Sequence, residues 1–414
     1  MILEIHGAGF QNKGAELMLR TVVKELKQRL PEFKPAIDPA YGPYDSRAEL
    51  GLLQIFPLRS HVGTFGFSKR FRQQKLFASL LNGKFFRHII GKQLIDYGCV
   101  GLSSIQGLID IAGFAYTDQW GPQPTNDFAK LTQYYKSRKK PVILLPQAFG
   151  PFKKDETRSA FKKVIANADL IFPRDRKSHE YVMELAPDTN KILRTPDITL
   201  FSQSVSENEA KTHSNYVCIV PNIRMLDQGK HQWGKKYETY LIQITKEIIG
   251  RGISVRFVLH DSSGDDLKIA RYISQKISSQ AISVIDETDP FAIKEMIGES
   301  LLLIGSRYHS LIAAFSKKVP AIALGWAHKY KMLFEDFGCE KLLILPETSI
   351  GAVLECVTAL INEDVNLSYR HKIAKQLQKM HLVNQEMWER VIAVLTSAEY
   401  GLQGALWPDF SKQR

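Results

Sequence analysis

Short apolar runs alternate along the chain with longer stretches in which apolar residues recur every three or four positions. The short runs fit strands buried on both faces, and the periodic stretches fit helices that pack one side on a sheet. In the first half, strands are predicted at Ile2–Ile5, Leu108–Ala112, Val142–Leu145 and Leu170–Phe172. The accompanying helices are predicted at Glu16–Leu30, Phe128–Arg138, Glu156–Asn167 and Arg176–Leu185. This alternation predicts a parallel sheet covered by helices on both faces.

The alternation stops at a polar, serine-rich stretch, Phe201–Ser214, which we interpret as an interdomain linker. It then restarts, with strands predicted at Tyr216–Val220, Val255–Leu259, Leu301–Ile304 and Ala321–Leu324. Helices are predicted at Tyr237–Ile249, Leu267–Ile277, His309–Ser316 and Tyr330–Phe337, and again over most of Tyr369–Ala398. We therefore predict an α/β protein with two Rossmann-like domains, at 1–205 and 206–414, facing each other across a cleft and ending in helices.

Composition narrows the classes of protein that fit this pattern. A length of 414 residues, 44% of them hydrophobic and 24% charged, suits two soluble globular domains. The four cysteines show neither a CxxC pair nor a zinc-like cluster with histidine, so no disulfide framework and no metal site are predicted. A strand opens the chain in place of a secretory leader, and no apolar run approaches the ~20 residues of a membrane helix. We expect a cytoplasmic protein, either free or peripheral to the inner face of the membrane.

The net charge of +12 is concentrated in one segment, Leu50–Ile95, which has eight basic residues and no acidic ones. The eight are Arg59, Lys69, Arg70, Arg72, Lys75, Lys84, Arg87 and Lys92. Such an asymmetry indicates an anionic partner: a phosphorylated substrate, a membrane surface or nucleic acid. Aromatic residues interleave with these bases, so the segment either lies on an anionic membrane or packs its aromatics into the N-terminal domain. No nucleic-acid recognition module is evident, and nucleic acid is not expected as a partner.

Polar residues that could carry chemistry follow the predicted strands. Gly7–Glu16 links the first strand to a helix, and its residues Gly9 and Asn12 suit either a tight turn or the close approach of an anion. Gln147 lies in a loop after the third strand, where it either contacts a ligand or caps the loop. All of these strand ends would face the predicted cleft.

Cationic side chains follow further strands. Arg174 ends one strand, with Asp175 positioned to cap the next helix, and its planar guanidinium suits a carboxylate or phosphate. Arg307 and His309 occupy the turn after the strand at 301–304, where an anion-binding arginine beside a titratable histidine suits acid–base chemistry on a phosphorylated substrate. Lys329, after the next strand, either adds charge to the same cleft or is solvated.

Together these motifs resemble the polysaccharide pyruvyl transferase family. The matching segments are Gly7–Glu16, Leu145–Phe152 (LPQAFGPF), Arg174–Ser178, Pro196-Asp197 and Arg307–Lys329. The resemblance extends from the first strand to about Gly338, and its most specific parts are the Arg-x-His helix and the Gln-x-x-Gly-Pro-Phe loop. Two positions depart from the family pattern: Ala15 stands where an aspartate is common, and Ala112-Gly113 replaces a Gly-Gly pair.

The resemblance implies a two-Rossmann fold of the GT-B type, phosphoenolpyruvate as donor, a sugar or lipid-linked saccharide as acceptor and no cofactor. It also implies that His309 is the general acid/base and that Arg307 and Arg174 hold the donor. From their positions after predicted strands, we also expect Gln147, Lys329, Asn12 and Gly9 in the substrate site. Two other readings of the residues stay open. One is a nucleotide-sugar glycosyltransferase on the same fold, and the other is a non-catalytic sugar-binding relative.

Overall fold

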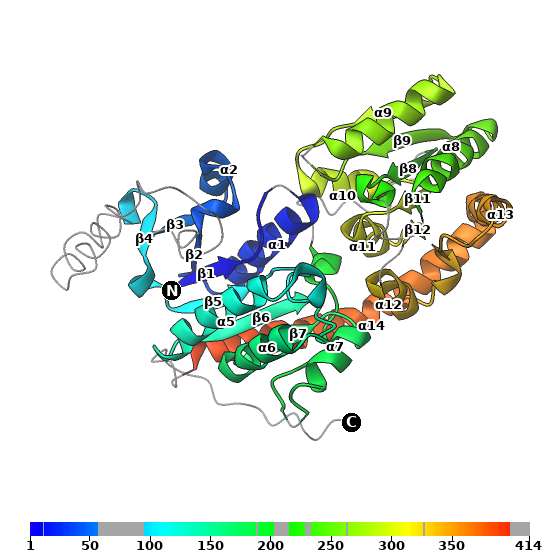
Figure 1. The fold of residues 1–414 in the computed structure, drawn as a ribbon. Coiled ribbons are helices and arrows are strands. Elements are labelled where there is room, and N and C mark those ends of the chain that lie inside the picture. The colour runs from blue at the N-terminus through cyan, green and yellow to red at the C-terminus, as the bar shows by residue number, and fades with distance from the viewer. Residues whose placement is uncertain are drawn as a thin grey trace.

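The structure is a computed structural model that describes residues 1–10, 12–56, 95–187, 189–202, 215–227, 233–261, 264–325 and 328–397. Most of the basic segment, 57–94, and most of the predicted linker, 203–214, lie outside the described residues, as does the C-terminal end. Figure 1 shows two lobes, each built on its own sheet, with the described chain crossing between them.

The first lobe contains a seven-stranded parallel sheet in the order β4-β3-β2-β1-β5-β6-β7. Its strands are β1 (Ile2–His6), β2 (Lys34–Ile37), β3 (Leu53–Phe56), β4 (Cys99–Gly101), β5 (Gly107–Asp110), β6 (Val142–Gln147) and β7 (Leu170–Pro173). Its helices are α1 (Lys13–Arg29), α2 (Tyr44–Glu49), α5 (Gln123–Lys136), α6 (Asp155–Asn167) and α7 (Arg176–Met183). Because all the strands are parallel, their carboxyl ends meet at one edge of the sheet.

The second lobe contains a six-stranded parallel sheet in the order β10-β9-β8-β11-β12-β13. Its strands are β8 (Tyr216–Val220), β9 (Ser254–Val258), β10 (Ile282–Ile285), β11 (Leu302–Gly305), β12 (Ala321–Leu324) and β13 (Leu343–Ile344). Its helices are α8 (Lys235–Gly250), α9 (Asp265–Ile277), α10 (Pro290–Gly298), α11 (Tyr308–Ser316), α12 (His328–Asp336), α13 (Ile350–Ile361) and α14 (Glu363–Thr396). The predicted two-sheet α/β architecture is confirmed.

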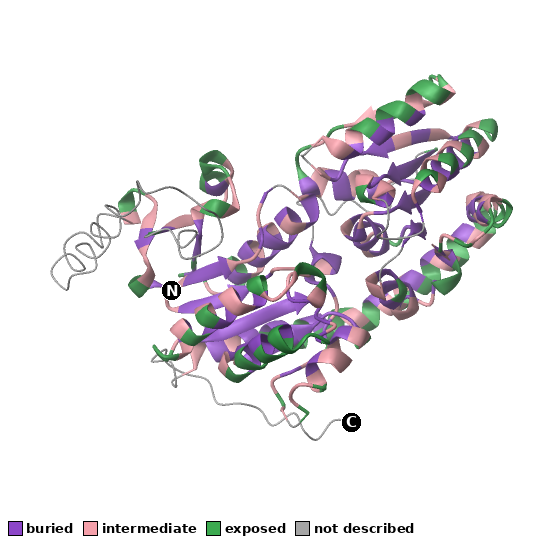
Figure 2. Ribbon diagram, viewed as in Figure 1, coloured by how far each residue is buried: buried purple, intermediate pink, exposed green. Residues whose placement is uncertain are grey.

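The central strands are buried on both faces, as their continuous apolar sequences require. Figure 2 shows this as buried strands flanked by helices whose outer sides are exposed. The residues of β6, β8, β11 and β12 are all buried. Burial of these runs on both sides is the main apolar contribution to holding each sheet under its helices.

The last helix joins the two lobes. α14 follows α13 in the second lobe and then extends beneath the first sheet (Figure 1). Near its end, Met387, Trp388 and Val391 belong to the same core cluster as Leu3 and Ile5 of β1. The predicted boundary at 205/206 falls in the segment outside the described residues, and the chain returns to the first lobe at its end.

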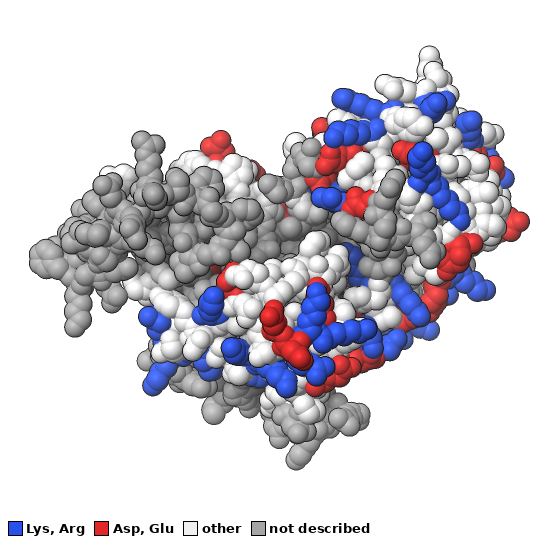
Figure 3. Space-filling model, in the orientation of Figure 1, with Lys and Arg blue, Asp and Glu red and all other residues white. Residues whose placement is uncertain are grey.

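None of the helices in the described ranges combines the length and the apolar character needed to cross a membrane. Lysine and arginine alternate with aspartate and glutamate over much of the described face in Figure 3. The positive excess predicted for 50–95 therefore falls mainly on residues that the structure does not describe.

Candidate active site

A buried ion pair lies at the carboxyl edge of the first sheet. Arg174 directly follows β7, and its Nη1 donates to Asp197 Oδ2 over 3.0 Å, with both side chains at most 2% exposed. The other carboxylate oxygen of Asp197 accepts from the backbone N–H and the hydroxyl of Thr199. Burial by itself disfavours the charged carboxylate, but Arg174 and His309 outweigh it and lower the pKa of Asp197. Asp197 is therefore a fixed carboxylate.

His309 approaches this carboxylate from the second lobe. It is the second residue of α11, and its Nε2 lies 3.9 Å from Asp197 Oδ2, buried and without a hydrogen-bond partner. Burial lowers its pKa to about 4, and Arg174 and Lys329 act in the same direction against Asp197. His309 is therefore a neutral imidazole near pH 7, able to accept a proton beside a carboxylate that stabilises the charged form.

The first turn of α1 closes over the His309 ring. A β-carbon at Gly14 would lie 2.1 Å from Nδ1 of His309. α1 begins at Lys13, three residues before the predicted start, because the Asn12 side chain accepts from the N–H groups of Gly14 and Ala15. Asn12 also forms an isolated bridge to Asp261 of the second lobe. Asn12 thus fixes the helix start that touches His309.

Arg307 precedes His309 and is held by two aspartates. Its guanidinium donates to both carboxylate oxygens of Asp266, at 2.9 and 2.7 Å, and lies 3.1 Å from Asp261. Burial opposes its charge, but these carboxylates prevail and raise its pKa. Arg307 is therefore a permanent cation whose orientation is fixed by the two aspartates, and it acts electrostatically on Lys329.

Lys329 completes a group of three cations. Its ammonium lies 5.5 Å from the ring centre of Tyr308 and 5.6 Å from that of Phe114, which belongs to the first lobe. Burial, together with Arg174 and Arg307, lowers the pKa of Lys329 to about 7. The face of Tyr308 also packs on Arg174, whose guanidinium carbon is 4.1 Å from the ring centre. A bound anion would relieve the repulsion among these cations.

A second polar group lines the edge of the first sheet. Asp110, fully buried at the end of β5, accepts from Gln147 Nε2 at 2.6 Å and from the Tyr116 hydroxyl at 2.9 Å. His6 Nδ1 lies 2.7 Å from the same carboxylate. The Oε1 atom of Gln147 is buried without a partner, and its backbone carbonyl accepts from Arg174 N–H. This hydrogen bond places the Asp110 group next to the cations along the sheet edge.

The predicted residues thus fall into two neighbouring groups. His309, Arg307, Arg174, Lys329 and Asn12 lie around the contact between the lobes. Gln147 belongs to the Asp110 group, whereas Gly9 packs so closely on the carbonyl of Tyr41 that a β-carbon would lie 2.4 Å from it. Gly9 therefore has a packing requirement that the sequence did not reveal.

Sequence reasoning missed several members of these groups. The sequence marks Asp197 only as part of a Pro-Asp pair, and Tyr308 falls in the predicted turn between Arg307 and His309 with no role assigned to it. His6 and Asp110 each end a buried strand, which is the signal that could have marked them. Within the described ranges, no group of three or more His, Cys, Asp or Glu side chains could hold a metal ion.

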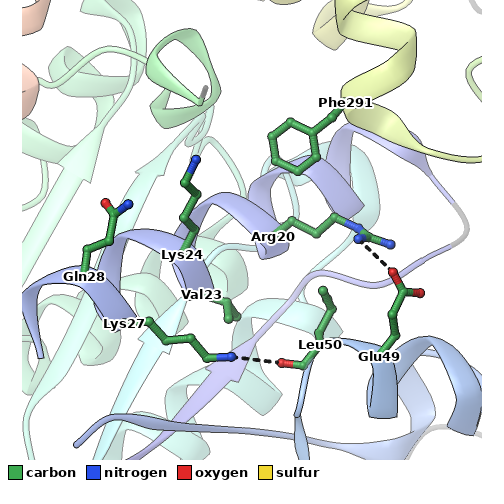
Figure 4. Close-up of a pocket in the computed structure, with 8 residues that line it drawn as sticks. All are labelled: Arg20, Val23, Lys24, Lys27, Gln28, Glu49, Leu50 and Phe291. Atoms are coloured by element: carbon green, nitrogen blue, oxygen red, sulfur yellow. Dashed lines mark hydrogen bonds and ion pairs between the residues drawn. The ribbon is translucent and has the colours of Figure 1, made fainter. Parts of the chain in front are cut away.

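A hollow of about 430 Å³ lies away from these groups, between α1, α2 and α10 (Figure 4). Its cations have partners: Arg20 pairs with Glu49, and Lys27 donates to the carbonyl of Leu50. Phe291 of α10 borders it from the second lobe. None of the predicted site residues lines this hollow, so the His309 group, where the titratable residues converge, is the candidate active site.

Comparison with known proteins adds a sequence family. The sequence model described as polysaccharide pyruvyl transferase matches residues 12–328. The amylovoran biosynthesis protein AmsJ of Erwinia amylovora is 21% identical over 301 residues, which cover 67% of this chain and 69% of AmsJ.

Solved structures share the architecture at low sequence identity. S. aureus MnaA, determined with UDP, superposes with a TM-score of 0.58 at 12% identity, covering 95% of this chain and 96% of MnaA. The UDP-GlcNAc 2-epimerase of Neisseria meningitidis, bound to UDP-GlcNAc, gives a TM-score of 0.56 at 12% identity, covering 94% and 99%. These likenesses establish the predicted GT-B fold, with two Rossmann-like halves.

Proposed function

This chain belongs to the polysaccharide pyruvyl transferase family, and we propose that it transfers the pyruvyl group of phosphoenolpyruvate to a sugar. The acceptor is a sugar of a cell-surface polysaccharide or of its precursor, free or lipid-linked, and the products are a ketal and phosphate. The observation that carries this proposal is the convergence of Arg174 and Lys329 on the His309–Asp197 pair, with Arg307 acting on Lys329.

Phosphoenolpyruvate carries a carboxylate and a phosphate, which together need several cations. Arg174 and Arg307 are held in place by aspartates, so they would meet the donor with little loss of side-chain freedom. Lys329, with a pKa of about 7, would gain a proton as the donor binds. The three cations would also neutralise the leaving phosphate, which is the electrostatic requirement of this reaction.

His309 has the protonation state that the first step needs. As a neutral imidazole it would take the proton of the first sugar hydroxyl. Asp197 would stabilise the imidazolium, which then gives that proton to C3: the π electrons of the C2–C3 double bond form the new C3–H bond, and the sugar oxygen bonds to C2 in the same step. The second hydroxyl would displace phosphate from C2, and its proton would leave with the phosphate. Protons and electrons balance over these steps, so the proposed reaction needs no cofactor.

Phosphate release tests the proposal directly. Purified protein is given phosphoenolpyruvate together with free, nucleotide-linked and lipid-linked sugars. We expect acceptor-dependent release that falls by about 10²–10⁴ in His309→Ala. His371→Ala, at an exposed position on α14, serves as the matched control and should keep wild-type activity. A fully active His309→Ala variant would remove His309 from the mechanism.

A nucleotide-sugar glycosyltransferase is the second candidate, because the GT-B fold is shared with structures determined with UDP or UDP-GlcNAc. The two functions differ in the ligand that stabilises the folded protein. We expect phosphoenolpyruvate to raise the melting temperature, and UDP or GDP to have no effect. The reverse result would favour glycosyl transfer. A protein that binds sugar yet never releases phosphate would be a non-catalytic relative.

Peripheral membrane contact through 50–95 is a separate proposal, with the protein at the cytoplasmic face. Its support is the run of bases with interleaved aromatic residues, of which 57–94 lie outside the described residues. Binding to anionic liposomes should weaken when the bases are changed to glutamine. Binding that is absent, or unchanged by these substitutions, would reject the membrane role.

A further inference from the structure

Trp120, in the loop that follows β5, is exposed, which is unusual for a side chain of its size. It is 57% exposed, whereas Trp233 and Trp388, the other tryptophans of the described chain, are each 1% exposed. Leaving an indole in water forgoes a large apolar contribution to folding. The position therefore has a role other than packing.

The indole is held in one orientation. Its Nε1 donates to the carbonyl of Phe114 over 2.8 Å, and its backbone N–H donates to Thr117. The turn that carries it, Asp118–Trp120, is fixed to the neighbouring loop, because Asp118 Oδ2 accepts from the backbone N–H groups of Lys153 and Lys154. A rigid aromatic surface costs little conformational entropy when a ligand binds.

The indole is continuous with the proposed active site. Phe114, whose carbonyl holds Trp120, lies 5.6 Å from the Lys329 ammonium and 5.9 Å from the ring of His328, both in the second lobe. The loop that contains Phe114 and Trp120 follows β5 at the carboxyl edge of the first sheet, the edge that ends in Asp110. Phe114 therefore connects the indole to Lys329 and to the other cations of the proposed site.

We propose that Trp120 forms part of the binding site for the acceptor saccharide and that one sugar ring stacks on the indole. The inference rests on the proposed function, because it assigns the acceptor side of that same site. The ring N–H is already used by Phe114, so Trp120 offers a flat apolar face and no donor. The C–H face of a pyranose matches such a surface and leaves the sugar hydroxyls directed elsewhere. In a tryptophan that anchors a protein to a membrane, the indole N–H usually bonds to water or lipid headgroups. The N–H of Trp120 bonds to Phe114 instead, which disfavours a membrane as its partner.

Intrinsic tryptophan fluorescence tests saccharide binding at Trp120 without requiring turnover. The protein is titrated with the methyl glycosides of galactose, glucose and mannose, in the absence of phosphoenolpyruvate. We expect an emission change with at least one glycoside in the wild type, and its loss in Trp120→Phe. No Trp120-dependent change with any of the three overturns the proposal. Trp120-dependent binding to anionic liposomes, with no response to glycosides, overturns it in favour of a membrane contact.

Turnover provides the second readout. We expect Trp120→Ala to raise the acceptor KM about tenfold or more and to leave the KM for phosphoenolpyruvate unchanged, with Trp120→Phe nearer to the wild type. Tyr97→Ala is the matched control, because Tyr97 is 80% exposed and precedes β4 at the far edge of the sheet. If the acceptor KM is unchanged in Trp120→Ala, Trp120 is not part of the acceptor site. If the wild type releases no phosphate but keeps the fluorescence response, pyruvyl transfer is overturned. The saccharide-binding site at Trp120 would then still be supported.

Discussion

Gly14 and His309 touch across the two lobes so closely that only a glycine fits between the helix and the ring. A β-carbon at position 14 would lie 2.1 Å from Nδ1 and 2.3 Å from Cγ of the imidazole. Gly14 is the second residue of α1 and His309 is the second residue of α11, so two helix starts meet at the proposed acid/base. The glycine is required here for close approach rather than for an unusual backbone angle.

Gly14→Ala should therefore displace the imidazole while the protein stays folded. The clash with the buried ring should cost about 1–3 kcal/mol of stability, offset in part by up to ~1 kcal/mol from the helix preference of alanine. kcat should fall by about 10² because the ring leaves its position near Asp197. Gly351→Ala is the matched control: Gly351 is also the second residue of a helix, and a β-carbon there meets nothing within 4 Å. Steady-state kinetics and thermal unfolding of both variants decide the point. Equal activity of the two would show that the ring tolerates the added methyl group.

Much of this site was visible in the sequence because parallel sheets put their polar residues where buried strands end. The strands at 216–220 and 321–324 were predicted to the residue, and the cations Arg174 and Arg307 follow β7 and β11 closely. Such strands are apolar throughout, and a polar residue at their end stands out. The family resemblance then singled out His309.

The relationships between distant segments could not be predicted in this way. Nothing local in the sequence pairs Asp197 with Arg174 or places Gly14 on His309, because these contacts depend on how the lobes meet. Strands were also missed where they lack a clear pattern. β2 (KPAI) contains Pro35, which argues against an internal strand, and β10 is only partly buried at a sheet edge.

The proposed donor site should bind phosphoenolpyruvate more weakly as the pH rises through 7. The pKa of Lys329 is lowered to about 7, so the ammonium is charged below this pH and neutral above it. An anion prefers the charged form, and affinity can fall by up to about tenfold per pH unit above the pKa. Lys329→Arg stays charged over this range and should flatten the dependence. Isothermal titration between about pH 6 and pH 8.5 measures both proteins, and the comparison removes the ionisation of the donor itself. Identical slopes for the two proteins would contradict the role of Lys329.

Loss of the Asp197 carboxylate should cost stability as well as activity. Asp197→Asn leaves Arg174, whose side chain is 2% exposed, as a buried cation without its partner, and this is expected to cost about 3–5 kcal/mol. The double variant Arg174→Met, Asp197→Leu removes both charges and should recover most of that stability, yet it should have no transfer activity. Chemical denaturation and phosphate release distinguish the two effects. A double variant as unstable as Asp197→Asn would show that the charge pair is not the cause.

A buried lysine ties the proposed active site to the second lobe and should make stability depend on pH. Lys294 of α10 is 1% exposed, and its ammonium donates to the carbonyls of Thr199 and Ser202 and to the Ser202 hydroxyl. Both residues lie in or at the end of the short helix that Asp197 caps, so Lys294 holds the segment that carries the carboxylate. Burial, with a contribution from Lys317, lowers its pKa from 10.5 to about 7.

Proton linkage sets the direction in which the free energy of unfolding changes with pH. Between pH 7 and 10.5 the unfolded chain keeps the Lys294 proton while the folded protein releases it, so this group makes folding more favourable as the pH rises through that window. The gain is at most about 1.4 kcal/mol per pH unit, and below the folded pKa the burial cost is constant. Lys294→Met should lack this gain, and it should also lose the three hydrogen bonds, at a cost of about 1–3 kcal/mol for the acceptors left unpaired. Urea unfolding at about pH 7, 8 and 9 measures the difference, with the exposed Lys276→Met as control. If wild type and Lys294→Met gain stability in parallel over this range, Lys294 is not the group that titrates.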